Sequence, residues 1–484
     1  MSIAVTAGGA AGVRERIQPT RGGDLVWLAL GLLAAAVYAL GLAARRPDIL
    51  VGGGVCLVLP LLLAWRLEAG LIVVVIARPG LDVFAETKVA SVYGLSLNPA
   101  SVLALLIIAV GAPYLVERWR ELRNAPSIRP YMLFALLAAM SVVVAPSKGS
   151  AITELLRLWS ILFTYALVYV VAASSRQALR RLTFALIGSA ALPIIWACGQ
   201  YSAGGSRKIG DFNRLTGTFL HPDPYGIYLA LVIVAAVPII LKRGWINRLL
   251  VLWVPFAGFA LVASYTRTAW IMVVLGVVVI GLLRYRWLLL LVPIMLAGAL
   301  VLIPSTGSRF NDIQNPKQSV RGPGNAFVAR VQLWREDLPK AKQKPLTGLG
   351  LAAIVDKSSD ASHVHSDFIR ALVETGIFGL LAYVAVLGSA VIGALRAYLH
   401  CRRESLLGAL TLGGFAASVC YTLASFDSNL MTQIVVSQTA WGLFAIAHAA
   451  HRISAQPRPP TAGNDLGERR SARRDRFRVL SGTP

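Results

Sequence analysis

Two arginines in the sequence lie directly beside long apolar stretches, where a charged side chain is costly unless it has a partner. Arg214 lies a few residues before an apolar run that begins near Pro222, and Arg267 lies between two apolar runs that almost touch. A guanidinium group has the planar shape and permanent charge that match a phosphate group. The N–H groups of a helix that begins near Pro222 would also attract an anion, with His221 beside them as a supporting residue. We therefore expect Arg214 and Arg267 to bind a diphosphate.

Each arginine also has a simpler interpretation. Arg214 equally suits the membrane interface, where its charged head would reach the lipid head groups. Arg267 equally suits an ion pair, although few carboxylates are available near that boundary, namely Glu86, Glu154, Asp211, Asp223 and Asp427. Local sequence leaves these alternatives open.

Two histidines, His363 and His365, stand just before the longest apolar stretch and are followed by Asp367. A histidine at this border titrates near neutrality, so it can act as a general base on a sugar hydroxyl. The three residues would alternatively bind zinc, but no further strong ligand stands nearby and we expect no metal. Two solvated loop histidines are the third interpretation.

Two arginines and a histidine around one cavity would form a coherent site. The arginines would stabilise a diphosphate leaving group, and the histidine would take the proton of the attacking hydroxyl. The sequence has no Walker motif and no GxGxxG segment that opens a helix. A lipid-linked donor therefore fits better than a sugar nucleotide.

Composition places these residues in a membrane protein. Of 484 residues 56% are hydrophobic and 14% are charged, with a mean hydropathy of +0.65. A soluble enzyme has roughly a quarter of its residues charged, so that class is excluded. The formal net charge of +24 would suggest nucleic acid in a soluble chain, but on this chain it is typical of cytoplasmic loops and tails. We expect no nucleic-acid partner.

The apolar runs predict an all-α, polytopic membrane protein, because about 20 apolar residues in a helix cross the hydrocarbon core. Fourteen spans are predicted, and twelve or thirteen remain as alternatives. Their residues are 25–44, 49–65, 70–86, 99–116, 130–146, 152–173, 182–200, 223–241, 249–264, 268–283, 287–303, 367–396, 407–425 and 429–450.

The charge pattern predicts which side each link faces. With the amino terminus inside, five short links that carry Lys and Arg all fall on the cytoplasmic side, as the positive-inside rule requires: they are 117–129, 174–181, 242–248, 284–286 and 396–403. The candidate site residues then fall outside, in the 201–222 link, the 264–268 turn and the large loop 304–366. Within that loop, apolar spacing predicts a helix over residues 328–342.

The sequence divides into three parts. Residues 1–23 are expected to be a disordered cytoplasmic head, 24–450 the membrane domain and 451–484 a disordered basic cytoplasmic tail. The tail's arginines either fix topology alone or also attract anionic lipid head groups, by about 1 kcal/mol each.

Four short motifs in a fixed order make the sequence similar to the O-antigen ligase and O-antigen polymerase superfamily. The resemblance covers about residues 205–400 in detail. An Arg-x-x-Gly-Thr-Phe segment followed by His-Pro is matched by Arg214 to Pro222, and a Ser-x-x-Arg-x-Ala-Trp turn by Ser264, Arg267, Ala269 and Trp270. An Arg-x-x-x-Trp helix that runs to Pro-Leu-x-Gly-x-Gly is matched by Arg330, Trp334, Pro345, Leu346, Gly348 and Gly350, and a His-Ser pair followed by Gly-x-x-Gly by His365, Ser366, Gly376 and Gly379.

The resemblance implies a fold and a site. The fold would be similar to that of GT-C-type glycosyltransferases, which are all-helical and metal-independent, and no cofactor is expected. His365 matches the family's catalytic histidine, Arg214 and Arg267 match its diphosphate-binding arginines, and Arg330 would orient the outer helix. Ser366 and Asp223 stand where Asn is commoner, and neither change removes a catalytic group.

The leading functional hypothesis is therefore a glycosyltransferase in the bacterial cytoplasmic (inner) membrane with its active site facing the periplasm. It would transfer a glycan from a polyprenyl-diphosphate-linked donor to a glycan or glycolipid acceptor, with inversion, among membrane lipids. Ligase and polymerase remain alternatives within this hypothesis. A lipid-linked oligosaccharide flippase or another transporter is the alternative from a different class, although a transporter more often shows internal repeats and polar midplane segments.

Overall fold

The structure is a computed structural model of the 484-residue chain. It describes residues 63, 65–84, 90–92, 95–97, 99–209, 212–242, 245–302, 326–354, 365–402 and 405–455. The predicted head 1–23, the span 25–44, most of the span 49–65, His363 and nearly all of the tail 451–484 lie outside these described residues.

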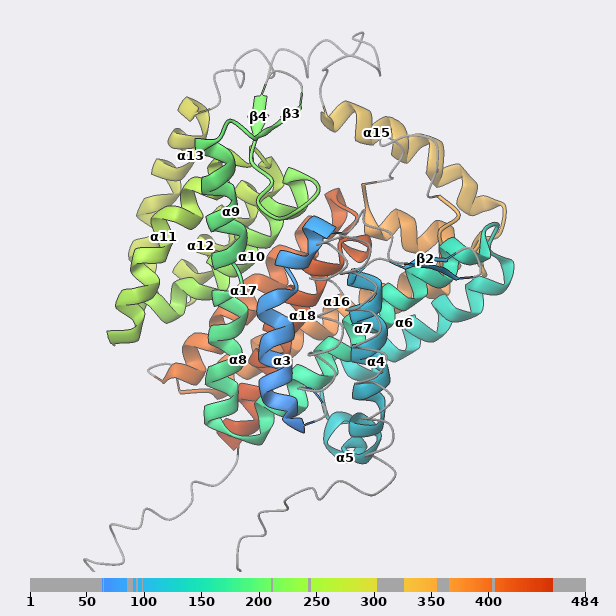
Figure 1. The fold of residues 1–484 in the computed structure, drawn as a ribbon, viewed down its shortest axis with the longest axis horizontal. Helices are drawn as coiled ribbons and strands as arrows, with labels where there is room; N and C mark the ends of the chain where they lie inside the picture. The colour runs from blue at the N-terminus through green and yellow to red at the C-terminus, as the bar shows by residue number, and fades with distance from the viewer. Residues whose placement is uncertain are drawn as a thin grey trace, which may run out of the picture.

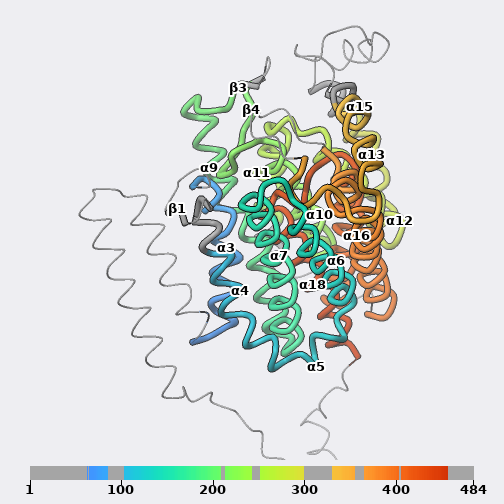
Figure 2. The backbone as a smooth tube through the Cα atoms, turned by 90° about the vertical axis from the view of Figure 1, so that its right-hand side faces the viewer, coloured from blue at the N-terminus to red at the C-terminus, as the bar shows by residue number. Residues whose placement is uncertain are grey.

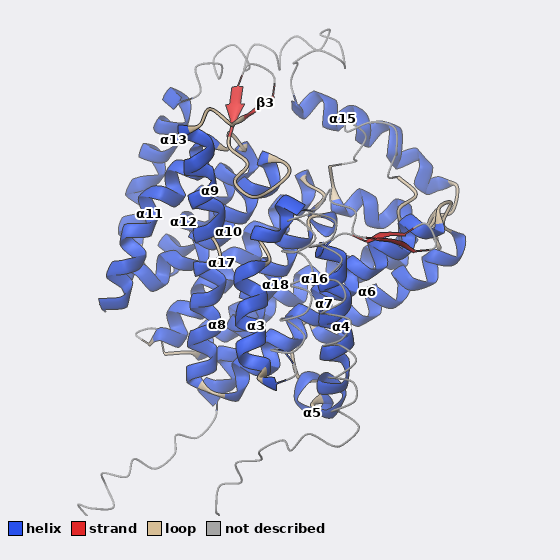
Figure 3. Ribbon diagram, viewed as in Figure 1, coloured by secondary structure: helices blue, strands red, loops and turns tan. Residues whose placement is uncertain are grey.

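The described chain is almost entirely helical (Figure 3). Its α-helices are α3 (Leu67–Ala77), α4 (Pro99–Glu117), α5 (Trp119–Leu122), α6 (Ile128–Ser141), α7 (Lys148–Ser174), α8 (Arg176–Gly188), α9 (Ala191–Ser202), α10 (Pro222–Leu241), α11 (Trp245–Ala263), α12 (Arg267–Leu283), α13 (Leu291–Leu302), α15 (Ala326–Asp337), α16 (Asp367–His400), α17 (Leu406–Asp427) and α18 (Ile434–Ala455). Short 3-10 helices are η1 (Gly80–Phe84), η2 (Val142–Val144), η3 (Arg286–Leu290), η4 (Leu338–Lys342) and η5 (Leu430–Thr432). Two antiparallel hairpins pair β1 (Ala90–Val92) with β2 (Leu95–Leu97) and β3 (Arg207–Ile209) with β4 (Phe212–Arg214).

The all-α polytopic membrane fold predicted from the sequence is confirmed. Five helical segments are long and apolar enough to cross a membrane: Lys148–Ser174, Arg176–Ser202, Pro222–Leu241, Asp367–His400 and Leu406–Asp427. Each predicted span from 70–86 onward coincides with one or more of the helices described above. The total number of spans stays a prediction.

Two predicted spans are less regular than the hydropathy suggests. The span 182–200 is divided between α8 and α9 by a turn at Ser189 and Ala190. The span 367–396 lies in α16, which is broken at Gly376, where φ is 73°. The mean hydropathy of both segments stays high across the breaks, at 1.8 and 2.2, so hydropathy could not reveal them.

The helix predicted over residues 328–342 of the large loop is confirmed. It is made of α15 and η4, with Pro339 inside the 3-10 turn rather than ending the helix.

The central helices of the bundle are α7, α10, α16, α17 and α18, which pack along one another. Helices α11, α12 and α13 flank them on one side and α4 and α6 on the other (Figure 1). Helix α10 begins at Pro222, whose missing N–H costs nothing in a first turn. The Nδ1 of His221 accepts a hydrogen bond of 3.3 Å from the N–H of Asp223 and so caps the helix. It is apolar on every face and almost fully buried, which is typical of a helix surrounded by others.

The bundle has two chemically different ends (Figures 1 and 2). We call the end that carries β3, β4 and α15 the loop end, and the end that carries α5 the basic end. At the basic end Arg181 pairs with Glu68 at 3.1 Å and Arg452 pairs with Glu121 at 3.1 Å. These contacts join α8 to α3 and α18 to α5 at this end.

Candidate active site

Arg214 is the last residue of β4 and only 14% of its side chain is exposed. Its Nε donates to the Ser264 carbonyl at 2.8 Å. Its Nη2 donates to the Oδ1 of Asp223 at 2.5 Å and to the Oγ1 of Thr266 at 3.1 Å. Arg214 therefore fastens the β3–β4 hairpin to both the start of α10 and the turn before α12.

The start of α10 and the turn at residues 264–266 are in direct contact. Thr266, which is buried, donates its Oγ1 proton to the Pro222 carbonyl at 3.0 Å. A Cβ at Gly226 would lie 2.6 Å from the Cβ of Thr266, so only glycine allows this approach. The first two sequence motifs, about fifty residues apart, thus form one surface at the loop end.

His221 belongs to the same surface but has a local role. Its Nδ1 caps α10 and lies 3.6 Å from the Oδ2 of Asp223, and 43% of its side chain is exposed. This geometry supports the start of the helix beside Arg214.

Arg267 is the first residue of α12 and its side chain is exposed. Its neighbour Thr268 donates to the Oδ2 of Asp427, at the end of α17, at 2.7 Å. The other oxygen of Asp427 is paired with Arg330 of α15. Asp427 and Asp223 are thus engaged with other arginines, and within the described parts of the chain no carboxylate pairs with Arg267. Glu154 is also paired with other arginines, and the two remaining candidate partners of Arg267, Glu86 and Asp211, lie outside the described residues.

His365 lies immediately before α16 and is half-buried, with its backbone in the left-handed region at φ 48°. The N–H of the next residue, Ser366, donates to the side-chain oxygen of Asn429 at 3.1 Å. An ordinary side chain adopts a positive φ only when its surroundings hold it there. The backbone at His365 is therefore fixed from the connection between α17 and α18.

Asp367 is turned into the protein and is fully buried. Its carboxylate accepts hydrogen bonds from the N–H groups of Leu430 and Met431 at 3.0 and 3.2 Å and from the Tyr383 hydroxyl at 3.0 Å. With its oxygens used in this way, Asp367 fastens η5 to α16. The proposed supporting role beside His365, or as a zinc ligand with it, does not fit this orientation.

The residues Asp427 to Asn429 connect the two halves of the candidate site. Asp427 contacts Thr268, the neighbour of Arg267, and Asn429 contacts Ser366, the neighbour of His365. Sequence reasoning named Asp427 only as one of several ion partners and missed Asn429. The available signal was a short polar run, Asp427-Ser428-Asn429, between two apolar spans.

The glycine motifs of the large loop and of α16 pack against each other. Gly348 and Gly376 both have positive φ, of 71° and 73°, and a Cβ at Gly376 would lie 2.2 Å from the Leu346 carbonyl oxygen. The break in α16 exposes carbonyls, and those of Val373 and Glu374 accept hydrogen bonds from Leu349 and Gly350 at 2.8 and 3.0 Å. This contact fixes the first turns of α16, directly after His365.

Sequence reasoning named Glu154 of α7 only as a possible ion partner of Arg267, and it missed two charged residues of α16, Arg370 and Glu374. They form a buried ion cluster, in which Arg370 donates to Glu374 at 3.0 Å and to Glu154 at 3.2 Å. The i, i+4 spacing of an arginine and a glutamate within an apolar run was the signal that could have revealed it.

These features define a class: an all-helical membrane protein with a polar site at one end, built from arginines, a histidine and a large loop. Residues 250–384 match the protein-family model described as O-Antigen ligase. This match confirms the resemblance to the O-antigen ligase and polymerase superfamily that was drawn from the motifs. Arg267, Arg330 and His365 lie inside the matched region, and Arg214 lies before it.

A curated relative is similar over a shorter stretch. This chain is 33% identical over 98 residues to a protein named exopolysaccharide production protein ExoQ from Rhizobium meliloti (strain 1021). The alignment covers 17% of this chain and spans 22% of the relative's length.

Proposed function

We propose that the protein is a membrane glycosyltransferase of the O-antigen ligase or polymerase type, acting in bacterial cell-surface polysaccharide biosynthesis. One observation carries the proposal: the Asp427–Asn429 connection contacts the neighbours of both Arg267 and His365. An exposed arginine and a histidine in a fixed backbone conformation therefore share one polar surface. The family match and the name of the similar relative support the same class of reaction.

In the proposed reaction His365 takes the proton of an acceptor sugar hydroxyl, and the oxygen attacks the anomeric carbon of the donor glycan. The new glycosidic C–O bond forms as the bond to the diphosphate breaks, with inversion at that carbon. Polyprenyl diphosphate leaves with the bonding electron pair. No metal or cofactor is assigned, because arginine would stabilise the negative charge that develops on the leaving group.

The geometry suggests different roles for the two diphosphate arginines. Arg267 is exposed at the first residue of α12, where the N-terminal N–H groups also favour an anion. Arg214 already donates from Nε and Nη2 to groups of the protein. We infer that Arg267 contacts the diphosphate directly, and that Arg214 offers only Nη1 to the donor while it holds the 264–268 turn in place.

We further propose that the loop end faces the periplasm and the basic end the cytoplasm of an inner-membrane protein. The arginines of α5, α8 and α18 at the basic end support this orientation through the positive-inside rule. The lipid-linked donor would then be used on the outer face of the membrane.

Transfer by the purified protein tests the proposed reaction, with a polyprenyl-diphosphate-linked glycan as donor and a surface glycan as acceptor. His365→Ala is expected to lower kcat by about 10²–10⁴-fold, the usual contribution of a general base. Arg267→Ala is expected to lower kcat/KM by about 10²–10³-fold, since it removes charge stabilisation in the transition state.

Matched controls are available at the basic end, where His400→Ala and Arg402→Ala change exposed residues of the same types. Both controls should transfer glycan at the rate of the unmodified protein. Full activity of both His365→Ala and Arg267→Ala would show that the mechanism is wrong. Movement of the donor across a vesicle membrane without any transfer would indicate a transporter instead.

A further inference from the structure

The buried ion cluster of Arg370, Glu374 and Glu154 is incompletely paired. The side chains of Arg370 and Glu374 are 5% and 2% exposed. The second carboxylate oxygen of Glu154 is paired with Arg157. Two buried atoms, the Nη1 of Arg370 and the Oε1 of Glu374, have no hydrogen-bond partner within the described residues. A buried ion that is left with an unsatisfied donor or acceptor is costly, which favours a ligand at these two atoms.

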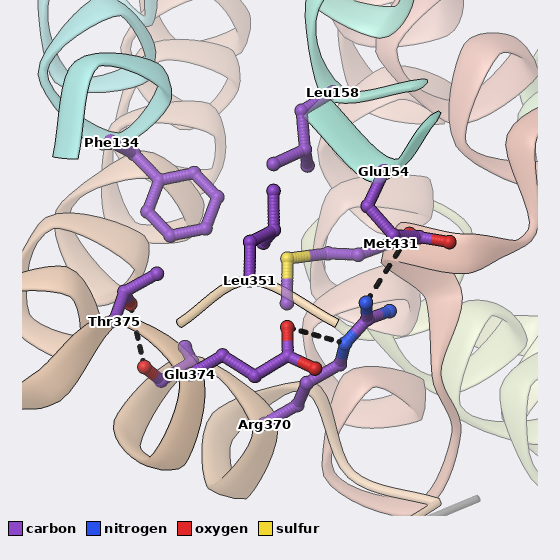
Figure 4. A pocket seen from close by; sticks show the side chains of 9 residues that line it. Phe134, Glu154, Leu158, Leu351, Arg370, Glu374, Thr375 and Met431 are labelled. Atoms are coloured by element: carbon purple, nitrogen blue, oxygen red, sulfur yellow. Dashed lines mark hydrogen bonds and ion pairs between the residues drawn. The ribbon is translucent and has the colours of Figure 1, made fainter. Parts of the chain in front are cut away.

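A small cavity is lined by the two residues that carry these atoms (Figure 4). Arg370, Ala371 and Glu374 of α16 line it. Its other walls come from α6, α7, η5 and the segment after η4, with Phe134, Leu158, Met431 and Leu351 among them. Its volume is about 10 Å³, enough for one water-sized group. The guanidinium in Figure 4 lies between the two carboxylates at one side of the cavity.

The unpaired atoms specify the chemistry of the ligand. The Arg370 Nη1 is a donor and needs an acceptor, whereas the ionised Glu374 Oε1 is an acceptor and needs a donor. A hydroxyl group supplies both functions from one oxygen. We propose that this cavity is a binding site for one hydroxyl group, belonging to a water molecule or to the acceptor sugar.

The site's place on α16 connects it to the candidate active site. Arg370 and Glu374 follow His365 by five and nine residues, which is about 8–14 Å along a helix at 1.5 Å per residue. Met431 lines the cavity, and its N–H is bonded to Asp367 in the first turn of α16. We infer that an acceptor sugar bound at His365 would extend along α16 toward this cavity. This acceptor source rests on the proposed function, whereas the water source does not.

A map of the purified full chain without substrate, detailed enough to show ordered water, gives the first test. We expect one density peak within hydrogen-bonding distance of both the Arg370 Nη1 and the Glu374 Oε1. If both side chains are in place with no peak between them, or if each is paired with protein atoms, the proposal is overturned. This test needs no transfer activity, so its outcome is independent of the proposed function.

Filling the cavity distinguishes the two sources. Ala371→Val adds methyl groups to a cavity wall, and Ala382→Val makes the same change at a buried position of α16 away from the cavity. If the acceptor supplies the hydroxyl, Ala371→Val raises the acceptor KM by about tenfold and leaves the donor KM unchanged. If the ligand is water alone, the peak is lost from the variant's map and neither KM changes. Ala382→Val should change neither.

Glu374→Gln provides a second variant should Ala371→Val fail to fold. It keeps the shape of the side chain and replaces the charged acceptor with a weaker one. If the acceptor supplies the hydroxyl, Glu374→Gln should raise the acceptor KM and leave the donor KM unchanged. If the ligand is water alone, the density peak should be lost and neither KM should change. A Glu374→Gln map with an unchanged peak and unchanged acceptor KM would overturn the assignment of Glu374 as the acceptor group.

Discussion

At the scale of single residues, the candidate site pairs its arginines unevenly. Arg214 is neutralised by Asp223 and Arg330 by Asp427, whereas Arg267 has no such partner in the described residues. The negative charges of Asp223 and Asp427 reduce the positive potential that Arg214 and Arg330 offer to a bound anion. The donor would therefore meet one uncompensated guanidinium, at the start of a helix, rather than a cluster of free arginines.

This arrangement predicts that Asp223→Asn strengthens donor binding. Asn keeps a side-chain oxygen for Arg214 but removes one negative charge beside the proposed diphosphate site. At short range near a protein surface that charge is worth about 1 kcal/mol, so the donor KM should fall about fivefold. The effect should weaken as salt is raised.

Glu121→Gln at the basic end is the matched control, because it also removes a carboxylate from an arginine pair. It should leave the donor KM unchanged. A rise in donor KM for Asp223→Asn would mean that the carboxylate positions Arg214 rather than opposing the anion.

Residue types and spacing were sufficient to select Arg214, Arg267 and His365 as candidates, because the positive-inside rule does not account for charged residues beside apolar runs on the predicted outer side. They were not sufficient to find Asn429 or the inward orientation of Asp367. Those depend on η5 folding back onto α16, a contact between segments about sixty residues apart. A polar residue in a short link looks the same in the sequence whether it holds a site together or faces water.

At the scale of elements, the positions of the helices follow from apolar runs, because a run of sufficient length has few other stable conformations in a membrane. Breaks within a run do not follow. The interruption of α16 at Gly376 exists because the Pro345–Gly350 segment donates hydrogen bonds to carbonyls that the break sets free. The glycine motifs are therefore needed for the contact between the Pro345–Gly350 segment and α16. The apolar pattern of either element alone does not predict this contact.

This contact predicts a large difference between two Gly→Ala changes in one helix. Gly376→Ala requires a positive φ and places a Cβ 2.2 Å from the Leu346 carbonyl oxygen. It should destabilise the protein by about 2 kcal/mol or more, from the strained backbone together with the clash. Gly388→Ala meets nothing within 4 Å and lies in regular helix, so it should be neutral or slightly stabilising.

Thermal unfolding of the two variants in the same detergent measures this difference. We expect a clearly lower Tm for Gly376→Ala and an unchanged or higher Tm for Gly388→Ala. Equal Tm values would mean that the break in α16 relaxes without cost and does not fix the first turns of the helix.

At the scale of the whole molecule, the arginine pairs of the basic end and the candidate site lie at opposite ends of the described helices. The arginines of α5, α8 and α18 gather at the basic end, whereas Arg214, Arg267 and Arg330 belong to the loop end. The positive-inside rule accounts for the first group. It does not account for the second, which is why those few arginines are the ones to which chemistry is assigned.

If the basic end is cytoplasmic, thiol labelling of intact cells should distinguish the two ends. In a chain whose four cysteines are replaced by Ala, Lys340→Cys marks an exposed residue of η4 at the loop end and Arg402→Cys an exposed residue after α16 at the basic end. A reagent that cannot cross the inner membrane should label Lys340→Cys at once and Arg402→Cys only after the cells are made permeable. Labelling in the reverse order would place His365 on the cytoplasmic side, where a donor exposed on the outer face could not reach it. The labelling tests the orientation of the chain and the transfer assay tests the reaction, and neither test depends on the other. Agreement between them would therefore support an outward-facing active site on two independent grounds.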